Sequence, residues 1–445
     1  MDGHFGSEVA SDAACVSHNR PVTSPPSFDA PVDADELGRR SSAILRVGLL
    51  MLGAGTASYR VKQGMATVAK SLGVAEHSEQ VTLTEITTTT RIGTLFRTEV
   101  SELRQHGVNA DRIARLDRFR RALPTRMTTA QVHTQLDEIE RHGAMYSKWL
   151  NSSFAGAACA GFAVLNRARF VEVLVVFLAA FIGQSVRREF GHRHFNAFGT
   201  VLVAAFTSTS VYVGSLALLG VMGTGIESHA SGYISSVLYL LPGFVLITGA
   251  LDMAKSDYSA GIVRLVHGTT LTIAAAVAVW GVSLLSPLDT SVRPSFGVPL
   301  WADLAIKAIA TMVGVGGFAM LFNSPWRMAF MAAVIGLVNV PRMVLIEHGM
   351  AVQTATFLAC FTLGLLAAIG AKGGRWPVIT LQVPAALVQI PGVLAHEAVV
   401  SLNEARYIDA TAGMLQVFLT VFAILVGLVV AKYLTDPHWA FERER

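Results

Sequence analysis

The chain has 445 residues, of which 52% are hydrophobic and only 15% are charged. A soluble protein typically carries about 25% charged residues, so this composition excludes an ordinary soluble globular protein and indicates a chain solvated mainly by lipid. The net charge is +4, and arginines cluster between residues 112 and 126. We expect this basic cluster to form a solvated face or a contact for anionic lipid, not a nucleic-acid site.

The first third of the chain is polar. Residues 1–40 are rich in Pro, Ser and Asp and contain no apolar segment of a signal peptide, so they predict a disordered tail. Residues 41–146 predict a small domain that is mostly helical with a little strand. The apolar run over residues 47–57 is too short to cross about 30 Å of hydrocarbon and is expected to be a buried helix. The segment VTLTEITTTT, which starts at Val81, has the alternation of a half-exposed strand.

Two later helices of this domain are predicted from their start and stop signals. One starts near Asn109 and ends before Pro124. The other starts at Thr128, because Thr128 and Gln131 have the spacing of a capping box. The apolar faces of these helices and of one preceding them consist of Val61, Met65, Val68, Leu72, Ile113, Leu116, Phe119, Val132, Leu136 and Ile139.

From residue 147 onward, long apolar runs alternate with short polar connections. About ten runs approach the roughly 20 residues that a spanning helix needs, and the first two are the shortest. We therefore predict an all-α polytopic membrane protein with about ten transmembrane helices. The predicted spans are 149–165, 170–186, 197–221, 231–253, 260–285, 299–322, 326–346, 350–371, 376–402 and 411–433.

Lysine and arginine are unequally distributed among the connections. They are more frequent on the side shared with the N-terminus, so the positive-inside rule predicts that both termini are cytoplasmic in a multi-pass protein of the cell (inner) membrane. The predicted inside residues are Arg187, Arg188, Arg193, Lys255, Arg264, Arg327, Lys372, Arg375, Lys432, Arg443 and Arg445, and the predicted outside residues are Arg167, Arg169, Arg293 and Arg406.

A weak internal repeat divides the membrane region. Pro242–Gly243 in LYLLPGFVLI interrupts the fourth span, and Pro391–Gly392 in LVQIPGVLAH interrupts the ninth. The prolines are 149 residues apart (391 − 242), which is one unit of five helices. Because five is odd, the units 147–287 and 297–434 would cross the membrane in opposite senses, leaving 435–445 as a tail. This is the inverted-repeat arrangement of secondary transporters.

Paired breaks of this kind have a physical reason to persist. Proline removes a backbone donor and glycine relaxes the helix, and hydrocarbon cannot satisfy the polar groups that are freed. The helix ends near Gly243 and Gly392 would offer N–H groups and positive dipole ends to a carboxylate. Either break taken alone is better described as an ordinary kink, whereas two breaks at matching positions favour a site that faces a cavity or a ligand.

The sequence resembles the threonine/serine exporter family of bacteria and fungi from about Ser42 to Lys432. In GAGTASYRVKQGMATVAKSLGV, Tyr59 and Arg60 match the family's opening pattern, while Lys62 replaces the acidic residue expected there. The stretch PGFVLITGALDMAKSDYSAGIVRL resembles the family's most specific segment, with matching positions at Pro242, Gly243, Thr248, Asp252, Gly261 and Arg264.

The resemblance implies a ten-helix exporter with a cytoplasmic N-terminal domain, moving threonine and serine outward by ion coupling. Relatives split into two polypeptides are associated with succinate export, so a dicarboxylate exporter on the same fold is the main alternative. That alternative requires additional cationic partners, of which the centre of the membrane region contains few. Gly249 stands where the family pattern has Asn, which bears on the substrate contacts.

Ionisable groups inside a membrane cost about 2.5–3.5 kcal/mol on insertion scales, so each one needs a reason. We expect Asp252 and Glu397 to meet the substrate ammonium or to exchange protons. Asp257, Gly261 and Arg264 are expected to be gating or structural residues. The predicted substrate-binding residues are Pro242, Gly243, Thr248, Asp252, Pro391, Gly392, His396 and Glu397.

Other polar residues of the apolar runs have simpler explanations. Asp303 and Lys307 are four residues apart and predict a structural ion pair. Glu172 is expected near the membrane interface, and His267 as a hydrogen-bonded core residue. Thr207 and Thr209 could meet a substrate hydroxyl, as could Thr248, but threonines that bond their own helix backbone are commoner.

Other function classes are less well supported. HEAVV resembles the start of a zinc-peptidase motif, but Val400 stands where the second histidine would be. There is no nucleophile elbow or phosphate-binding loop, so the sequence predicts no enzyme. The cysteines lie far apart, and no metal or other cofactor is expected. A channel or receptor stays open. The expected partners are a small-molecule substrate (threonine, serine or a small carboxylate), protons, the lipid bilayer and, in an oligomer, a second copy.

Overall fold

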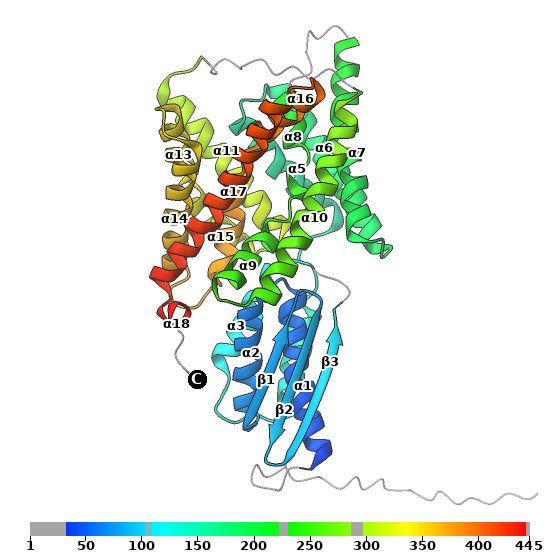
Figure 1. Ribbon diagram of the computed structural model, residues 1–445, viewed down its shortest axis with the longest axis vertical. Coiled ribbons are helices and arrows are strands. Elements are labelled where there is room, and N and C mark those ends of the chain that lie inside the picture. Colours follow the sequence, from blue (N-terminus) through cyan, green and yellow to red (C-terminus); the bar gives the residue numbers. More distant parts are fainter. Residues whose placement is uncertain (1–32, 104–106, 222–229, 286–296, 442–445) are drawn as a thin grey trace, which may run out of the picture.

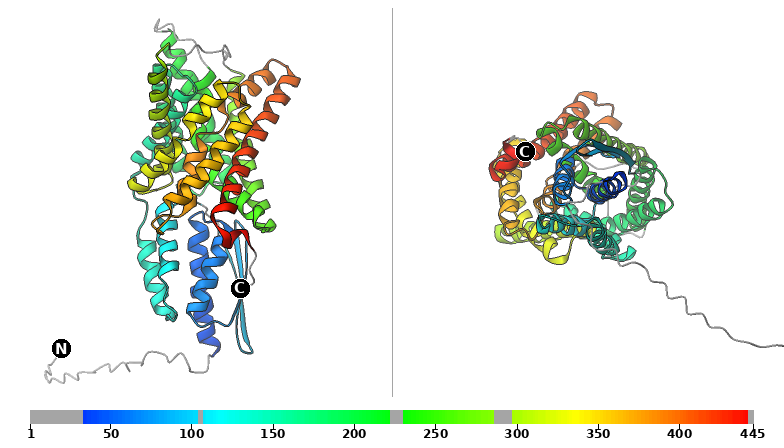
Figure 2. Two further views of the ribbon diagram at one scale, coloured as in Figure 1. Left: turned by 90° about the vertical axis from the view of Figure 1, so that its left-hand side faces the viewer. Right: turned by 90° about the horizontal axis from the view of Figure 1, so that it is seen from below.

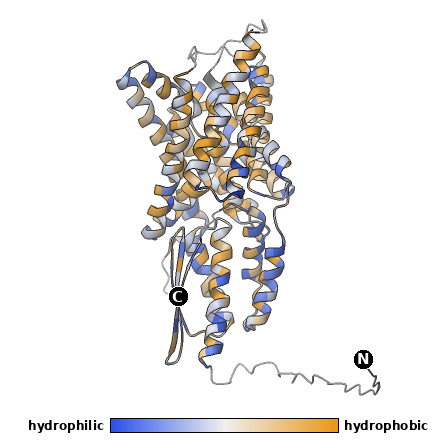
Figure 3. Ribbon diagram, turned by 90° about the vertical axis from the view of Figure 1, so that its right-hand side faces the viewer, coloured by the Kyte–Doolittle hydropathy of each residue, from blue (hydrophilic) through white to orange (hydrophobic). Residues whose placement is uncertain are grey.

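The computed structural model describes residues 33–103, 107–221, 230–285 and 297–441. An N-terminal domain packs against one end of a long helical bundle (Figure 1). We call that end of the bundle the near end and the opposite end the far end. Seen from below, the domain lies beneath the middle of the bundle (Figure 2, right). Hydrophobic residues dominate the bundle, whereas hydrophilic ones are frequent in the N-terminal domain (Figure 3).

The N-terminal domain is a three-stranded antiparallel sheet with four helices. Its strands are ordered β1-β2-β3, and Ile86, Thr88 and Thr90 of the central strand are buried. Residues from α1, α2, α4 and the sheet share one core, which includes Ile44, Val68 and Leu136. The elements are α1 (Ala34–Gly53), α2 (Ser58–Ser71), β1 (Glu76–Val81), β2 (Glu85–Ile92), β3 (Leu95–Glu102), α3 (Ala110–Ala122) and α4 (Thr129–Arg141).

The first helix starts earlier than the sequence analysis predicted. It begins at Ala34, inside the segment assigned to a disordered tail, whose residues 1–32 lie outside the described part. Asp33 caps this helix, because its carboxylate accepts a hydrogen bond from the Glu36 N–H at 2.7 Å. Glu36 also pairs with Arg39 and Arg40. The polarity of residues 33–40 therefore belongs to a capped helix start rather than to a disordered tail.

The predicted helix at Thr128 is confirmed in detail. The Thr128 hydroxyl accepts from the Gln131 N–H, and the Gln131 side chain accepts from the Thr128 N–H. Val132, Leu136 and Ile139 are buried as expected. The segment expected to form one strand contains a turn, because β1 ends at Val81 and β2 begins at Glu85. The sequence analysis did not predict β1 and β3, which are more exposed than β2.

The bundle contains helix in every one of the predicted spans. By length and composition, seven helices of the described residues can cross a membrane, or up to eight if one bent pair counts as a span. The elements are α5 (Lys148–Leu165), α6 (Phe170–His192), α7 (Ala197–Val221), α8 (Ala230–Ser235), η1 (Leu238–Leu240), α9 (Gly243–Ala254), α10 (Tyr258–Ser283), α11 (Leu300–Leu321), α12 (Trp326–Gly336), α13 (Asn339–Glu347), α14 (Val352–Gly370), α15 (Val378–Leu387), α16 (Gly392–Asn403), α17 (Tyr407–Thr435) and α18 (Pro437–Ala440).

The helix contacts in the first half of the bundle correspond to those in the second half. In the first half, α5 contacts α6, and α10 contacts α7 and α9. In the second half, α11 contacts α12, and α17 contacts α14 and α16. The halves meet along α5 and α11, one of the most extensive contacts in the molecule.

Glycines allow the backbones of α5 and α11 to approach each other closely. A Cβ at Gly317 would lie 2.8 Å from the Ala158 nitrogen, and one at Gly161 would lie 2.7 Å from the Ala310 carbonyl oxygen. Both obstacles are backbone atoms, which cannot move aside as a side chain can. Small residues that let helix backbones approach are characteristic of contacts inside membranes, where no hydrophobic force draws helices together.

This contact gives a first prediction. Gly317→Ala should destabilise the protein by about 1–3 kcal/mol, because the added methyl overpacks the crossing of α5 and α11. A Cβ at the neighbouring Gly316 would have no atom within 4 Å of it, so Gly316→Ala should be neutral or slightly stabilising. Thermal denaturation of both purified variants in detergent measures the difference. Equal melting temperatures would contradict the close contact.

Candidate functional site

Both Pro-Gly pairs interrupt a helical segment in the structure. Pro242 separates η1 from α9, and the two parts of this segment are bent by 61°. Pro391 separates α15 from α16. The prolines have similar backbone angles, with φ −80° and ψ 47° at Pro242 and φ −80° and ψ 73° at Pro391. The two breaks are therefore alike in conformation as well as in sequence.

The structure brings the two interrupted segments side by side. Gly243 lies so close to Leu387, the last residue of α15, that a Cβ on Gly243 would overlap the Leu387 side chain. Segment α9 packs against α15, and α8 packs against α16 (Figure 1). Gly392 faces α5, where a Cβ would lie 2.7 Å from the Phe162 ring and 3.4 Å from Asn166 Nδ2. The breaks thus adjoin each other and the central helix α5.

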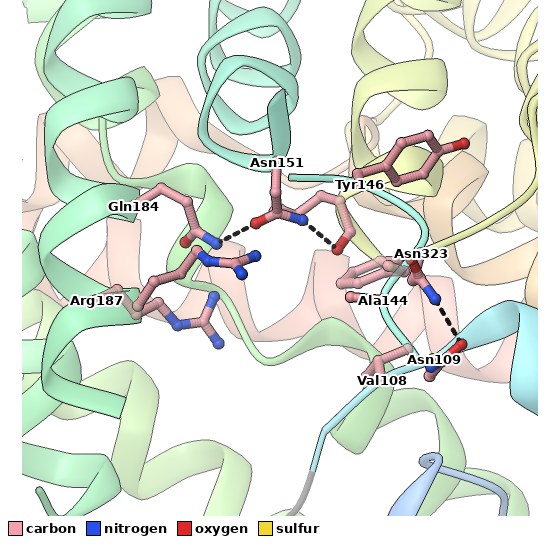
Figure 4. Close-up of a pocket in the computed structure, with 11 residues that line it drawn as sticks. Val108, Asn109, Ala144, Tyr146, Asn151, Gln184, Arg187 and Asn323 are labelled. Atoms are coloured by element: carbon pink, nitrogen blue, oxygen red, sulfur yellow. Dashed lines mark hydrogen bonds between the residues drawn. The ribbon is translucent and has the colours of Figure 1, made fainter. Parts of the chain in front are cut away.

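A cavity of about 320 Å³ opens at the near end of the bundle (Figure 4). Asn151 of α5 accepts a hydrogen bond from Gln184 Nε2 at 2.9 Å and donates to the Leu321 carbonyl at 3.2 Å. Gln184 Oε1 is buried without a hydrogen-bond partner. The lining residues are Val108, Asn109, Ala144, Tyr146, Asn151, Gln184, Arg187, Arg188, Leu321, Phe322 and Asn323.

The charged side chains that line this cavity are all positive. Arg187 and Arg188 contribute two guanidinium groups, and none of the lining residues carries a carboxylate. Within the described residues, neither arginine forms a salt bridge. Guanidinium and amide donors without a competing acid suit a carboxylate, which guanidinium can bind through two parallel hydrogen bonds.

The cavity lies close to the first break. Gly183, one turn before Arg187, lies so near Tyr239 and Ser208 that a Cβ there would overlap their hydroxyls. The Tyr239 and Ser208 hydroxyls are 3.0 Å apart and share a hydrogen bond. Tyr239 belongs to η1, directly before Pro242 and Gly243. An anion held by Arg187 would therefore be near the interrupted segment.

Asp252 and Arg264 form a buried pair that joins the bundle to the N-terminal domain. Arg264 Nε lies 3.2 Å from Asp252 Oδ2, and both side chains are almost completely buried. The Asp252 carboxylate accepts from the Ser58 and Tyr59 N–H groups at 3.1 and 3.3 Å. It thereby caps the N-terminus of α2, where a negative charge is stabilised by unpaired N–H groups and the helix dipole.

Arg264 also contacts the N-terminal domain directly. Its guanidinium donates to the Thr56 carbonyl at 3.0 Å, to the Ser58 hydroxyl at 3.3 Å and to the Thr248 hydroxyl at 3.2 Å. The assignment of Asp252 and Thr248 to substrate binding stays a prediction. In this structure Asp252 takes part in the joint between the domains, whereas the Thr248 hydroxyl accepts from Arg264 and donates to the Phe244 carbonyl of its own helix.

Further ion pairs surround this joint. Lys62 Nζ lies 2.7 Å from Asp257 Oδ2, so the lysine that departs from the family pattern has a partner in the turn after α9. Arg60 lies 3.7 Å from Asp436. Burial opposes ionisation of Asp436, but the hydrogen bond from Lys432 and the charges of Lys432 and Arg60 hold its pKa below the usual value. Gly261 allows α10 to approach α9, since a Cβ there would lie 2.9 Å from the Met253 nitrogen.

The remaining predicted residues differ in their exposure. Glu397 is exposed on α16, and the side chain of His396 on the same helix lies outside the described part. His267 is half-buried on α10. Their roles stay predictions. Thr207 and Thr209 bond their own helix backbone, as expected for the commoner case.

Three acidic residues, Asp303, Glu347 and Glu172, have structural contacts at helix ends. The predicted Asp303–Lys307 ion pair is confirmed at 2.6 Å, and Glu347 joins it at 2.8 Å from Lys307 Nζ. Glu172 is buried, and its carboxylate accepts from the Arg169 N–H and so caps α6. Its expected position near the membrane interface stays a prediction.

Sequence reasoning misses Gln184 and Arg187 as site residues. It treats Arg187 only as a charge of a connection, because the apolar run of the second span ends at residue 186. Helix α6 continues to His192, so both residues lie on the helix. The spacing of Gln184 and Arg187, three residues apart on one helical face, is the signal that could have found them.

Comparisons with known proteins cover most of the chain. Residues 42–285 match the family model described as "Putative threonine/serine exporter", and residues 307–434 match the one described as "Threonine/Serine exporter, ThrE". No solved structure matches the chain.

Two curated relatives match a shorter region. The "Probable succinate transporter subunit YjjP" of Escherichia coli (strain K12) is 29% identical over 134 residues, 30% of this chain and 51% of that protein. The protein of the same name from Klebsiella aerogenes is 28% identical over 134 residues, 30% of this chain and 50% of that protein. The chain thus spans about half the length of these relatives.

The joint between the domains gives a second prediction. Asp252→Asn leaves the buried Arg264 guanidinium without its carboxylate, and breaking a buried pair in this way costs about 3–5 kcal/mol. We expect a lower melting temperature and faster proteolysis of the N-terminal domain. Asp409→Asn is the control, because Asp409 pairs with Arg406 while more than half of its side chain is exposed. Equal stability of the two variants would argue against the joint.

Proposed function

The chain belongs to the threonine/serine exporter family, and we propose that it exports small metabolites carrying a carboxylate, threonine and serine among them. Membership makes it a membrane exporter. The observation that carries the finer proposal is the placement of the two interrupted segments side by side. Breaks of this kind, at matching positions of two repeats, surround the substrate in many secondary transporters.

We propose that the two halves are inverted repeats. Three features support this: corresponding helices pack in corresponding pairs, the Pro-Gly breaks have similar backbone angles, and the halves meet along α5 and α11. In such a protein, one half rocks against the other and exposes a fixed site to each side in turn. The glycine-lined contact of α5 and α11 is the surface along which we propose that the halves move.

The proposed orientation places the N-terminal domain and the near end in the cytoplasm of the cell. Arg187, Arg188, Arg327 and Arg375 line cavities at the near end together with residues of the N-terminal domain. An excess of Lys and Arg on one side of a multi-pass protein favours the cytoplasmic side. The near-end cavity would then receive substrate from the cytoplasm, in the direction that export requires.

The carboxylate is the chemical feature that the candidate substrates share. Threonine, serine and succinate each carry one, and the near-end cavity offers guanidinium and amide groups to bind it. Because no carboxylate lines this cavity among the described residues, an amino acid's ammonium lacks an anionic partner there. This observation favours a dicarboxylate such as succinate as the second candidate, in line with the name of the Escherichia coli relative.

We propose that transport is coupled to protons. Proton exchange needs a carboxylate that both sides can reach in turn. We keep Asp252 and Glu397 as candidates, although Asp252 is engaged with Arg264 and the α2 N-terminus. Transport through Asp252 would require the domain joint to open, which would couple the N-terminal domain to the transport cycle.

The test is efflux of preloaded radiolabelled threonine, serine and succinate from proteoliposomes, with and without an imposed proton gradient. Efflux of at least one of these carboxylates by the wild type, accelerated by the gradient, is the expected result. Absence of movement of all three by folded protein would overturn the proposal.

The interrupted segments give a third prediction. Pro391→Ala restores a backbone N–H at the second break and favours a continuous helix, so we expect efflux to fall about tenfold or more. Pro384→Ala is the matched control, because Pro384 lies inside helix α15 of the same segment. Initial efflux rates measure both. An equal effect of the two substitutions would mean that the break has no special role.

The near-end cavity gives a fourth prediction. Arg187→Gln removes a charge-assisted hydrogen bond worth about 1.5–3 kcal/mol, which corresponds to roughly 10- to 150-fold weaker substrate binding. We expect a higher KM for efflux. Arg193→Gln is the control on the same helix end, because Arg193 is exposed and pairs with Glu189. Unchanged KM in Arg187→Gln would place the carboxylate elsewhere.

A further inference from the structure

Arg342 is a buried cation beside the second break that the proposed function has not used. It lies on α13 and is only 8% exposed. Its guanidinium donates to Thr356 Oγ1 at 2.9 Å, to Asn339 Oδ1 at 3.1 Å and to the Gln389 carbonyl at 3.2 Å. Gln389 lies between α15 and Pro391, so Arg342 binds the interrupted backbone directly.

All three partners of Arg342 are neutral. Among the described residues, no carboxylate forms a salt bridge with this guanidinium. Glu347, on the same helix, is engaged with Lys307 and Arg167. A buried charge without a counter-charge is expensive, and inside a membrane such a residue is a functional-site candidate by default.

Gln389 supplies an independent observation at the same place. It is completely buried, and its side-chain oxygen accepts from the Cys360 thiol at 3.2 Å. Its Nε2 group is buried without a hydrogen-bond partner. A buried amide donor left unpaired costs about 1–3 kcal/mol, so it needs an explanation. Two sets of donors, one of them charged, thus lie beside the break and lack an anionic acceptor.

The arrangement resembles the one at the near-end cavity. On α6, Gln184 and Arg187 are three residues apart and lie close to the first break; on α13, Asn339 and Arg342 have the same spacing and lie close to the second. Segments α6 and α12–α13 occupy corresponding positions in the two halves. Each follows a residue with positive φ, Arg167 at 62° and Asn323 at 60°.

We propose that Arg342 and Gln389 form a second carboxylate-binding site, on the far side of the breaks from the site at Arg187. In this structure, the oxygens of Thr356, Asn339 and Gln389 hold the guanidinium, and a substrate carboxylate displaces them when the far end opens. The chemical class of ligand is a small organic carboxylate. The inference rests on the proposed function and adds to it a separate anchor for each side of the membrane.

A side-specific measurement tests this inference. Exchange of labelled succinate, threonine and serine is followed in right-side-out and inside-out vesicles, so that substrate meets the far or the near end first. We expect Arg342→Gln to raise the KM from the far side about tenfold or more and the KM from the near side much less, because a charge-assisted hydrogen bond is lost on one side only. Arg187→Gln should show the reverse.

Three further variants separate binding from folding. Arg342→Lys keeps the charge and should retain part of the far-side affinity. Gln389→Leu keeps the backbone carbonyl and removes the unpaired amide, and it should raise the far-side KM modestly. Arg406→Gln is the control, because Arg406 is an exposed arginine with Glu404 and Asp409 as partners. An Arg342→Gln protein that is folded but unchanged, or equally impaired from both sides, would overturn the inference.

The two proposals can fail separately. If wild-type vesicles exchange a carboxylate and Arg342→Gln has no side-specific effect, the exporter survives and the second site does not. If the wild type moves none of the three substrates, thermal stabilisation of the purified protein by succinate decides. Stabilisation that Arg342→Gln abolishes would support the site without transport, and no stabilisation of the wild type would overturn it.

Discussion

The interruption of two helices in the interior of an apolar bundle is the constraint on which the rest of the structure depends. Pro242 and Pro391 lack the N–H groups that would continue their helices, and lipid offers no substitute. The freed polar groups must therefore find partners within the protein. Gln389, whose carbonyl accepts from Arg342, is the clearest example. The interruptions draw polar side chains into the centre of the bundle and so create the conditions for a polar pathway.

Three arginines of the bundle, Arg187, Arg264 and Arg342, differ in the partners that surround their guanidinium groups. Arg264 has a carboxylate partner, Asp252, and that pair also caps a helix of the N-terminal domain. The hydrogen-bond partners of Arg342 are all neutral, and Arg187 forms no salt bridge with another described residue. The first arrangement stabilises a joint, whereas the second leaves a positive charge available to a ligand. The presence or absence of an acidic partner thus separates a structural arginine from a candidate binding residue.

The N-terminal domain is attached through the same segment that carries the first break. Helix α9 starts at Gly243 and carries Asp252 near its other end, so a single helix connects the first break to the joint. Lys62 and Asp257 add a second pair across the boundary.

Local features of the chain were enough to predict the class of protein, most helices, the capping box at Thr128 and the ion pair of Asp303 with Lys307, because periodicity, hydropathy and short spacings involve residues close together in sequence. The family was suggested by a resemblance, carried mainly by the stretch from Pro242 to Arg264. The same reasoning misplaced the start of α1 and ended the second span before Arg187, since polarity at a helix end resembles a loop. Only the tertiary structure shows which charged side chains have an ion-pair partner. In the folded protein Asp252 pairs with Arg264 and caps α2, whereas Arg342 has neutral partners. These contacts join residues far apart in the chain, so they depend on how the segments pack.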